Sequence, residues 1–291
     1  MLNRSALDAS ISYLREKSDA NLRLVVSTPG GRLAYAHHRW SNPSSRLTAK
    51  AFWKKELQSV SVDEHWEDII EGEVELLRFR EKQWLATTLK YLPPRHTFHT
   101  TVHLIGGYDS VVYGEDVALN LAARNFQNDR REAVYYLIHE LAHAGYLRYH
   151  RMPDLAGLKT FTELFETIRF LTHLEGMGVV SSFQKRIEEG GLSDSDYRAL
   201  LDEDEMNARV REYFTRLTKV EKAGNRRLDN GGLRILGQFS AGPRRLWYAT
   251  GCHMALAIEG RYGTMALRKI VKEGHRSFYR AYSTVEDPLS L

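Results

Sequence analysis

The sequence is poor in cysteine and contains no long apolar run. Cys252 is the single cysteine in 291 residues, which excludes an intramolecular disulfide framework and suits a reducing compartment. No apolar run of about eighteen residues occurs, so no transmembrane span is predicted. The chain meets Asp8, Arg15 and Glu16 before any apolar block develops, which indicates that it carries no signal peptide. These absences together predict a cytoplasmic protein.

Charge of one sign is not concentrated anywhere in the chain. The formal net charge is +4 and 43% of the residues are hydrophobic, as in an ordinary globular protein. The basic pairs at 130–131, 226–227 and 244–245 are isolated from one another, acidic residues are interspersed, and no nucleic-acid-binding motif occurs. We interpret the excess charge as solvated surface, and the minor alternative is a basic substrate groove or a nucleic-acid contact. The sequence gives no oligomeric state.

Helical composition dominates both ends of the chain. Gly and Pro clusters separate the candidate helices, and Pro93-Pro94 is the strongest internal boundary. Candidate strands at 98–105 and 116–121 follow it. The fold class predicted is α+β, mostly helical with a small sheet, in three parts: a helical region over 1–95, a core over 96–180, and a helical region over 181–291. The predicted helices span 6–19, 47–58, 62–92, 130–149, 159–174, 194–223, 244–259 and 264–272.

The most informative segment is the pentapeptide His-Glu-Leu-Ala-His at 139–143. Residues four apart share one face of a helix, so the imidazoles of His139 and His143 can reach the same metal ion. Glu140 lies one step round the helix, close enough to contact a metal-bound water without being a ligand. The alternative is a hydrogen-bonded histidine pair in the core or on the surface. Because the segment is largely apolar, we favour a zinc site.

A third ligand is expected on the next predicted helix, over 159–174. Its apolar side chains recur every three or four residues, and stepping seven residues from Ile168 reaches Glu175, near the centre of that stripe. A carboxylate there would need a partner such as zinc. The alternative is that Glu175 ends the helix, before Gly176, and escapes to water. Three further candidates are predicted to project toward solvent from the opposite side: Glu163, Glu166 and His173.

This pattern resembles the gluzincin class of zinc metallopeptidases, in which a Glu on a second helix is the third ligand. The resemblance covers about 98–180 and extends to bacterial and archaeal families of zinc-dependent peptidases whose substrates are unknown. It implies Zn²⁺ held by His139, His143 and Glu175, with Glu140 as general base. The metzincin pattern does not fit, because Tyr149 stands where that class has a third His.

The resemblance also implies a zincin-like fold, with an edge strand beside the active-site helix and a peptide or protein substrate held against that strand. From the residues alone, the strands at 98–105 and 116–121 could equally be internal. The implied reaction is hydrolysis by a zinc-activated water. Tyr248 is the first candidate for stabilising the oxyanion, and His253 is the second, although each could also be a packing residue.

The sequence therefore predicts a zinc-dependent metallohydrolase, most simply a peptidase. The competing hypothesis is a latent or non-catalytic scaffold that retains a zincin-like site. Glu140 argues against that alternative, because a structural zinc site has no use for an unliganded Glu and is more often closed by four protein ligands.

Overall fold

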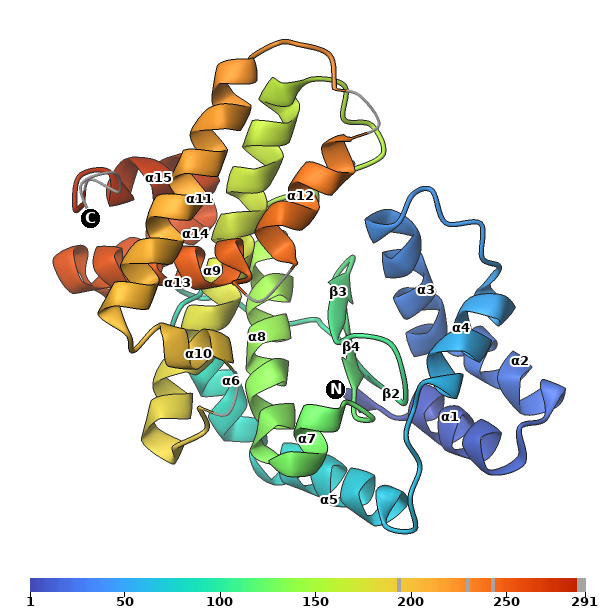
Figure 1. The fold of residues 1–291 in the computed structure, drawn as a ribbon. Coiled ribbons are helices and arrows are strands. Elements are labelled where there is room, and N and C mark those ends of the chain that lie inside the picture. Colours follow the sequence, from blue (N-terminus) through green and yellow to red (C-terminus); the bar gives the residue numbers. More distant parts are fainter. Residues whose placement is uncertain (193–194, 229–230, 242–243, 287–291) are drawn as a thin grey trace. The chain divides into compact units, whose positions relative to one another are not determined.

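The computed structural model describes residues 1–192, 195–228, 231–241 and 244–286. Helices dominate these residues, and a single small sheet of four strands accompanies them (Figure 1). The predicted α+β class with a small sheet is confirmed at this level. The chain divides into two compact units, one comprising Met1–Ala86 with Thr97–Arg148 and the other comprising Thr87–His96 with Tyr149–Leu291. No helix in the described ranges combines the length and apolarity needed to cross a lipid bilayer.

The first unit is built around the sheet. The strands are β1 (Leu2–Asn3), β2 (Val102–Ile105), β3 (Val111–Tyr113) and β4 (Asp116–Asn120). Their order is β1-β2-β4-β3, with β1, β2 and β4 parallel and β3 antiparallel to β4. All four side chains of β2 and most of those of β4 are buried, as expected for strands covered on both faces. Both predicted strands are therefore internal, and β3, which was not predicted, forms one edge.

The helices of this unit cover the sheet on both sides. Helix α8 contacts β3 and β4, while α1 and α3 contact β2 from the other side (Figure 1). A continuous core joins the two layers, and it includes the indole rings of Trp53 and Trp66 and the side chains of Leu104, Leu119 and Leu137. The helices are α1 (Ser5–Glu16), α2 (Asp19–Ser27), α3 (Pro29–Ser41), α4 (Ala49–Gln58), α5 (Trp66–Phe79), α7 (Arg124–Asn128) and α8 (Arg131–Leu147), and α6 (Glu81–Leu89) begins in this unit.

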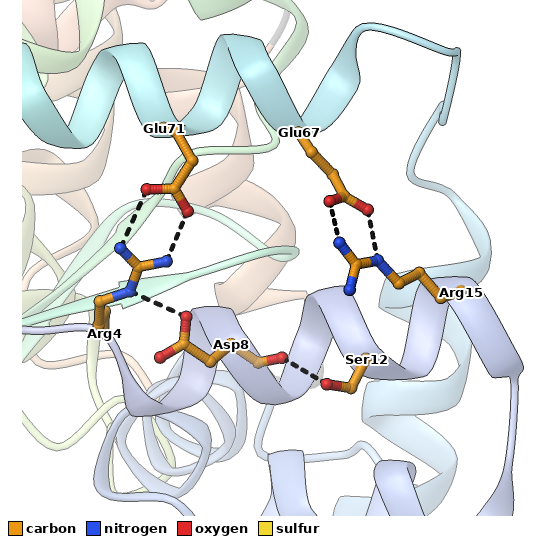
Figure 2. A network of polar contacts seen from close by, with 6 residues as sticks. All are labelled: Arg4, Asp8, Ser12, Arg15, Glu67 and Glu71. Atoms are coloured by element: carbon orange, nitrogen blue, oxygen red, sulfur yellow. Dashed lines mark hydrogen bonds and ion pairs between the residues drawn. The ribbon is translucent and has the colours of Figure 1, made fainter.

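Two arginine–glutamate pairs connect α1 to α5 (Figure 2). The guanidinium of Arg4 donates to both carboxylate oxygens of Glu71, at 3.0 and 2.5 Å, and Arg15 donates likewise to Glu67. Hydrogen bonds from these guanidinium groups lower the pKa of both carboxyl groups. Each pair is bidentate, which fixes the geometry, but both lie at the surface and contribute little to stability.

The second unit consists of helices and loops among its described residues, with one isolated β-bridge between Thr160 and Arg227. Helix α9 begins with a capping box, in which the Thr160 hydroxyl accepts from the Glu163 N–H and the Glu163 carboxylate accepts from the Thr160 N–H. It ends at Gly190, whose φ of 68° is in the left-handed region. The helices are α9 (Phe161–Glu189), α10 (Ser195–Ala199), α11 (Glu203–Ala223), α12 (Gly232–Ser240), α13 (Leu246–Tyr262), α14 (Thr264–Glu273) and α15 (His275–Tyr282).

Candidate metal centre

Helix α8 carries the residues of the pentapeptide. The helix predicted over 130–149 is confirmed as Arg131–Leu147, and most of its side chains are buried. Glu140 is 5% exposed and His143 is 7% exposed, while His139 is half-buried. Ionisable groups at such depth are costly unless they have compensating partners. The contacts of α8 with β3, β4 and α5 explain why an uninterrupted, largely apolar helix forms here.

The two imidazoles of α8 lie against each other. The ring centroids of His139 and His143 are 4.4 Å apart, with an angle of 65° between the ring planes. Four residues advance the helix by slightly more than one turn, which places both rings on one face. Two imidazoles brought together in this way can offer nitrogen atoms to a single ion.

Glu140 lies beside this pair. Its Oε2 is 3.6 Å from Nδ1 of His143, which is too long for a hydrogen bond but within ion-pair distance when the imidazole is protonated. Because Glu140 is only one residue beyond His139, its side chain leaves the helix in a different direction. The carboxylate of Glu140 therefore lies next to the two imidazoles but is not one of the three potential metal ligands, which are His139, His143 and Glu175.

Glu175 of α9 joins the two histidines in that group. One donor atom from each of His139, His143 and Glu175 lies within 4.8 Å of the other two, and no further group of this kind occurs in the described ranges. Zinc binds imidazole nitrogen and carboxylate oxygen at about 2.0–2.2 Å, so its ligand atoms lie roughly 3.5 Å apart. Two nitrogens and one oxygen fit zinc with small side-chain movements, and three protein ligands are usual in a catalytic site.

Glu175 is in the interior of α9 and not at its end. The prediction that the helix stops at Leu174 is wrong, because α9 continues through Gly176 and Gly178 to Glu189. A Cβ on Gly176 would lie 2.4 Å from the carbonyl carbon of Gly251 in α13. Gly176 therefore permits a close helix crossing, and what looked like a helix stop serves packing.

Tyr248 lies near Glu175. Burial is the main cause that raises the pKa of Tyr248, and the negative charge of Glu175 raises it further. The phenol therefore stays protonated around neutral pH and remains a hydrogen-bond donor. The guanidinium carbon of Arg245 lies 3.9 Å from the centroid of the Tyr248 ring, within range of a cation–π interaction. Arg245 has a φ of 36°, a left-handed conformation that is uncommon for a residue with a side chain.

The other ligand candidates have different surroundings. Glu163 belongs to the capping box, and Glu166 pairs with Arg169, Arg276 and His275. The expectation that His173 faces solvent is wrong, because its ring is fully buried and stacks on Phe278 with centroids 4.3 Å apart. Phe278 belongs to α15, which the sequence analysis did not predict.

His253, the second candidate for oxyanion stabilisation, is engaged elsewhere. Its Nε2 lies 2.9 Å from a carboxylate oxygen of Glu286. Two features near Glu175 were missed from the sequence: the guanidinium of Arg245 over Tyr248, and the crossing at Gly176 and Gly251. The signal for the crossing was present in the small residues of the two helices, Gly176 and Gly178 in one and Ala249 and Gly251 in the other.

Comparison with protein families gives a match over most of the chain. Residues 76–286 match the model of a family, DUF5700, that is described as “Putative zinc dependent peptidase”. Comparisons with curated proteins and with solved structures found no match. The matched range contains α8, α9 and α13, and with them all the residues of the candidate metal centre. The zinc dependence of the family agrees with the His-His-Glu group, which can bind a metal ion.

Proposed function

We propose that the protein is a zinc metallopeptidase of the gluzincin type. The chain belongs to the zinc-dependent peptidase family whose model matches residues 76–286. In this proposal His139, His143 and Glu175 hold the metal, within a zinc-binding core at 96–180. The observation that carries the proposal is the proximity of their three donor atoms, each within 4.8 Å of the others. Imidazole and carboxylate donors of this number and type are those of catalytic zinc sites.

The bound ion would supply Lewis acidity, lowering the pKa of a water molecule and polarising a carbonyl group. The protein's own contribution begins with Glu140. Its carboxylate is 5% exposed, so bulk water competes weakly for its hydrogen bonds. It accepts a proton from the attacking water and donates that proton to the departing amine. Its Oε2 lies 3.6 Å from Nδ1 of His143, and this proximity to a proposed ligand supports the role of general base.

Tyr248 is the proposed donor to the oxyanion that develops on the substrate carbonyl. Its phenol lies near Glu175, and the raised pKa keeps the O–H in place at the pH of hydrolysis. The guanidinium of Arg245, stacked on the ring, restricts the orientation of the phenol. We therefore expect Tyr248 to act on the transition state more than on substrate binding.

The substrate of a peptidase is a peptide or protein, and β3 offers a place for its backbone. This strand is the outer member of the β2-β4-β3 side of the sheet, and it contacts α8. No further described strand pairs with β3 on its other side, so an extended peptide could add there through main-chain hydrogen bonds. The zincin-like arrangement of edge strand and active-site helix would then use β3, and not the two strands first predicted from the sequence.

Peptide cleavage by the zinc-loaded protein tests the proposal. Wild-type protein should cleave members of a peptide library near neutral pH, lose this activity on chelation, and regain it with zinc. Glu140→Gln should retain zinc and lose hydrolysis by several orders of magnitude. If wild type holds stoichiometric zinc but never exceeds Glu140→Gln on any peptide, a latent or scaffold protein is the better description.

A further inference from the structure

A pocket of about 390 Å³ on the second unit is lined mainly by basic side chains. Its lining residues are Arg169 from α9 and Arg276, Tyr279, Arg280 and Ser283 from α15 and the residue that follows it. Three arginine side chains therefore line one hollow, whereas the hydroxyl of Tyr279 is bonded to that of the buried Tyr213. This composition is unlike that of the candidate metal centre, which is built from imidazole and carboxylate groups.

The arginine from α9 is held in a fixed orientation. The guanidinium carbon of Arg169 lies 4.5 Å from the ring centroid of Tyr279 and 5.1 Å from that of Phe165. Its Nη1 donates to Glu166 at 3.1 Å, while its buried Nε has no hydrogen-bond partner among the described residues. A planar guanidinium packed between aromatic rings loses little further freedom when it binds an anion. The guanidinium of Arg169 is thus preorganised, and its Nε–H is a donor without a hydrogen-bond partner among the described residues.

The pocket carries more positive than negative charge. The carboxylate that neutralises these arginines is Glu166, which accepts from both Arg169 and Arg276. Arg280 is exposed and forms no ion pair with any described residue. Three guanidinium groups against one carboxylate leave a surplus of two positive charges. Burial lowers the pKa of the neighbouring His275 despite the opposing effect of Glu166, so that imidazole adds no charge at neutral pH.

A surplus of two charges, presented from two helices, matches a phosphate dianion. A carboxylate has two oxygens, which one guanidinium fork can satisfy, whereas a phosphate group offers at least three oxygens in a tetrahedral array. The volume of about 390 Å³ exceeds that of an inorganic phosphate ion and leaves room for a small organic group. The hydroxyl of Ser283 donates to the carbonyl of Arg280, so the guanidinium groups are the donors that remain for such a ligand.

We propose that this pocket binds a phosphate group, either as inorganic phosphate or as a small phosphate monoester, through Arg169, Arg276 and Arg280. The site is distinct from the proposed active site. Arg169 and Glu175 are six residues apart on α9, which separates their side chains by roughly 120° around the helix axis. The face of α9 that stacks on α15 through His173 and Phe278 is the one that carries the pocket. Binding here depends on neither zinc ligation nor Glu140.

Calorimetric titration of the zinc-loaded protein tests the site. Inorganic phosphate, O-phosphoserine and acetate are titrated separately into wild type, Arg280→Ala and Arg261→Ala. Arg261 is an exposed arginine of α13 in the same unit, so its replacement removes the same charge elsewhere. Wild type and Arg261→Ala should bind one phosphate group per chain, and Arg280→Ala should bind it at least about tenfold more weakly. Far-UV circular dichroism verifies that the variants are folded.

The other outcomes are equally decisive. Phosphate bound at the metal would be unaffected by Arg280→Ala, so equal affinity in wild type and this variant overturns the proposal, as does the absence of saturable binding. Acetate binding as tightly as phosphate would mean a carboxylate site. Tighter binding of O-phosphoserine than of inorganic phosphate would identify a phosphate monoester as the ligand. None of these results depends on hydrolysis, so they are independent of the proposed peptidase activity.

Discussion

Gly176 of α9 and Gly251 of α13 lie so close that neither position has room for a methyl group. A Cβ on Gly176 would lie 2.4 Å from the carbonyl carbon of Gly251, and a Cβ on Gly251 would lie 2.3 Å from the carbonyl oxygen of Thr172. The clash in both cases is with backbone, which cannot rotate away. Glu175 precedes one glycine and Tyr248 stands three residues before the other. The close crossing therefore brings the proposed third ligand and the proposed oxyanion donor together.

Replacing Gly251 by alanine should force α9 and α13 apart. We expect Gly251→Ala to lower the free energy of unfolding by about 3 kcal/mol, because the added methyl group meets backbone atoms. Gly260→Ala is the matched control, since Gly260 is in the same helix and a Cβ there meets nothing within 4 Å. That change should be neutral or stabilising by up to about 1 kcal/mol. Thermal unfolding of both variants measures the difference, and equal melting temperatures would contradict the tight crossing.

Glu175→Ala should weaken zinc binding by about 100-fold or more. Loss of a group that only orients a ligand already weakens metal binding by about 10–100-fold, and loss of the ligand itself should cost more. The control is Glu166→Gln on the same helix, whose carboxylate pairs with Arg169, Arg276 and His275 instead. Zinc affinity in that variant should stay within a few-fold of wild type. Competition with a chromophoric chelator gives both affinities. A silent Glu175 together with a large effect at Glu166 would refute the ligand assignment.

Tyr248→Phe should reduce kcat by about 100-fold or more while zinc content and KM change little, because the phenol acts on the transition state. Tyr262→Phe in the same helix is the control, since Tyr262 is 48% exposed and its hydroxyl pairs with Thr284. Steady-state kinetics on a cleaved peptide separates the two constants. An effect confined to KM would assign Tyr248 to substrate binding.

Glu73 of α5 should make stability depend on pH. Its side chain is fully buried, neither carboxylate oxygen has a hydrogen-bond partner among the described residues, and burial raises its pKa to about 8 against the opposing charge of Arg130. The folded protein thus keeps a proton that the unfolded chain releases near its ordinary pKa of 4.5. The stabilisation is complete below that value and is lost as the pH rises to about 8.

Glu73→Gln should remove this dependence, because a neutral amide mimics the protonated acid at every pH. Relative to the variant, wild type should lose stability on the order of 3–5 kcal/mol between pH 5 and 9. Urea unfolding at several pH values measures it. Glu75→Gln, at an exposed position of the same helix, should keep the wild-type profile. Parallel profiles for wild type and Glu73→Gln would show that Glu73 ionises without a penalty.

The strands and several helices followed from local pattern. Apolar periodicity and breakers located α4, α8, α13 and α14 within a few residues, and the two predicted strands appear as β2 and β4. The helix predicted over 62–92 is divided at Arg80 into α5 and α6, where the Trp84 indole N–H donates to the carbonyl of Leu77. That contact depends on a turn that no local periodicity marks.

The sequence by itself determined the spacing of His139, Glu140 and His143, because helical geometry converts a separation of four residues into a shared face. It also determined the phase of Glu175 on its helix. Only the tertiary structure decided that Gly176 continues the helix, since the reason lies in Gly251, seventy-five positions away. The burial of His173 and the pocket at Arg169 were decided in the same way, by α15 packing onto α9. Such contacts join distant segments, and local propensity carries no information about them.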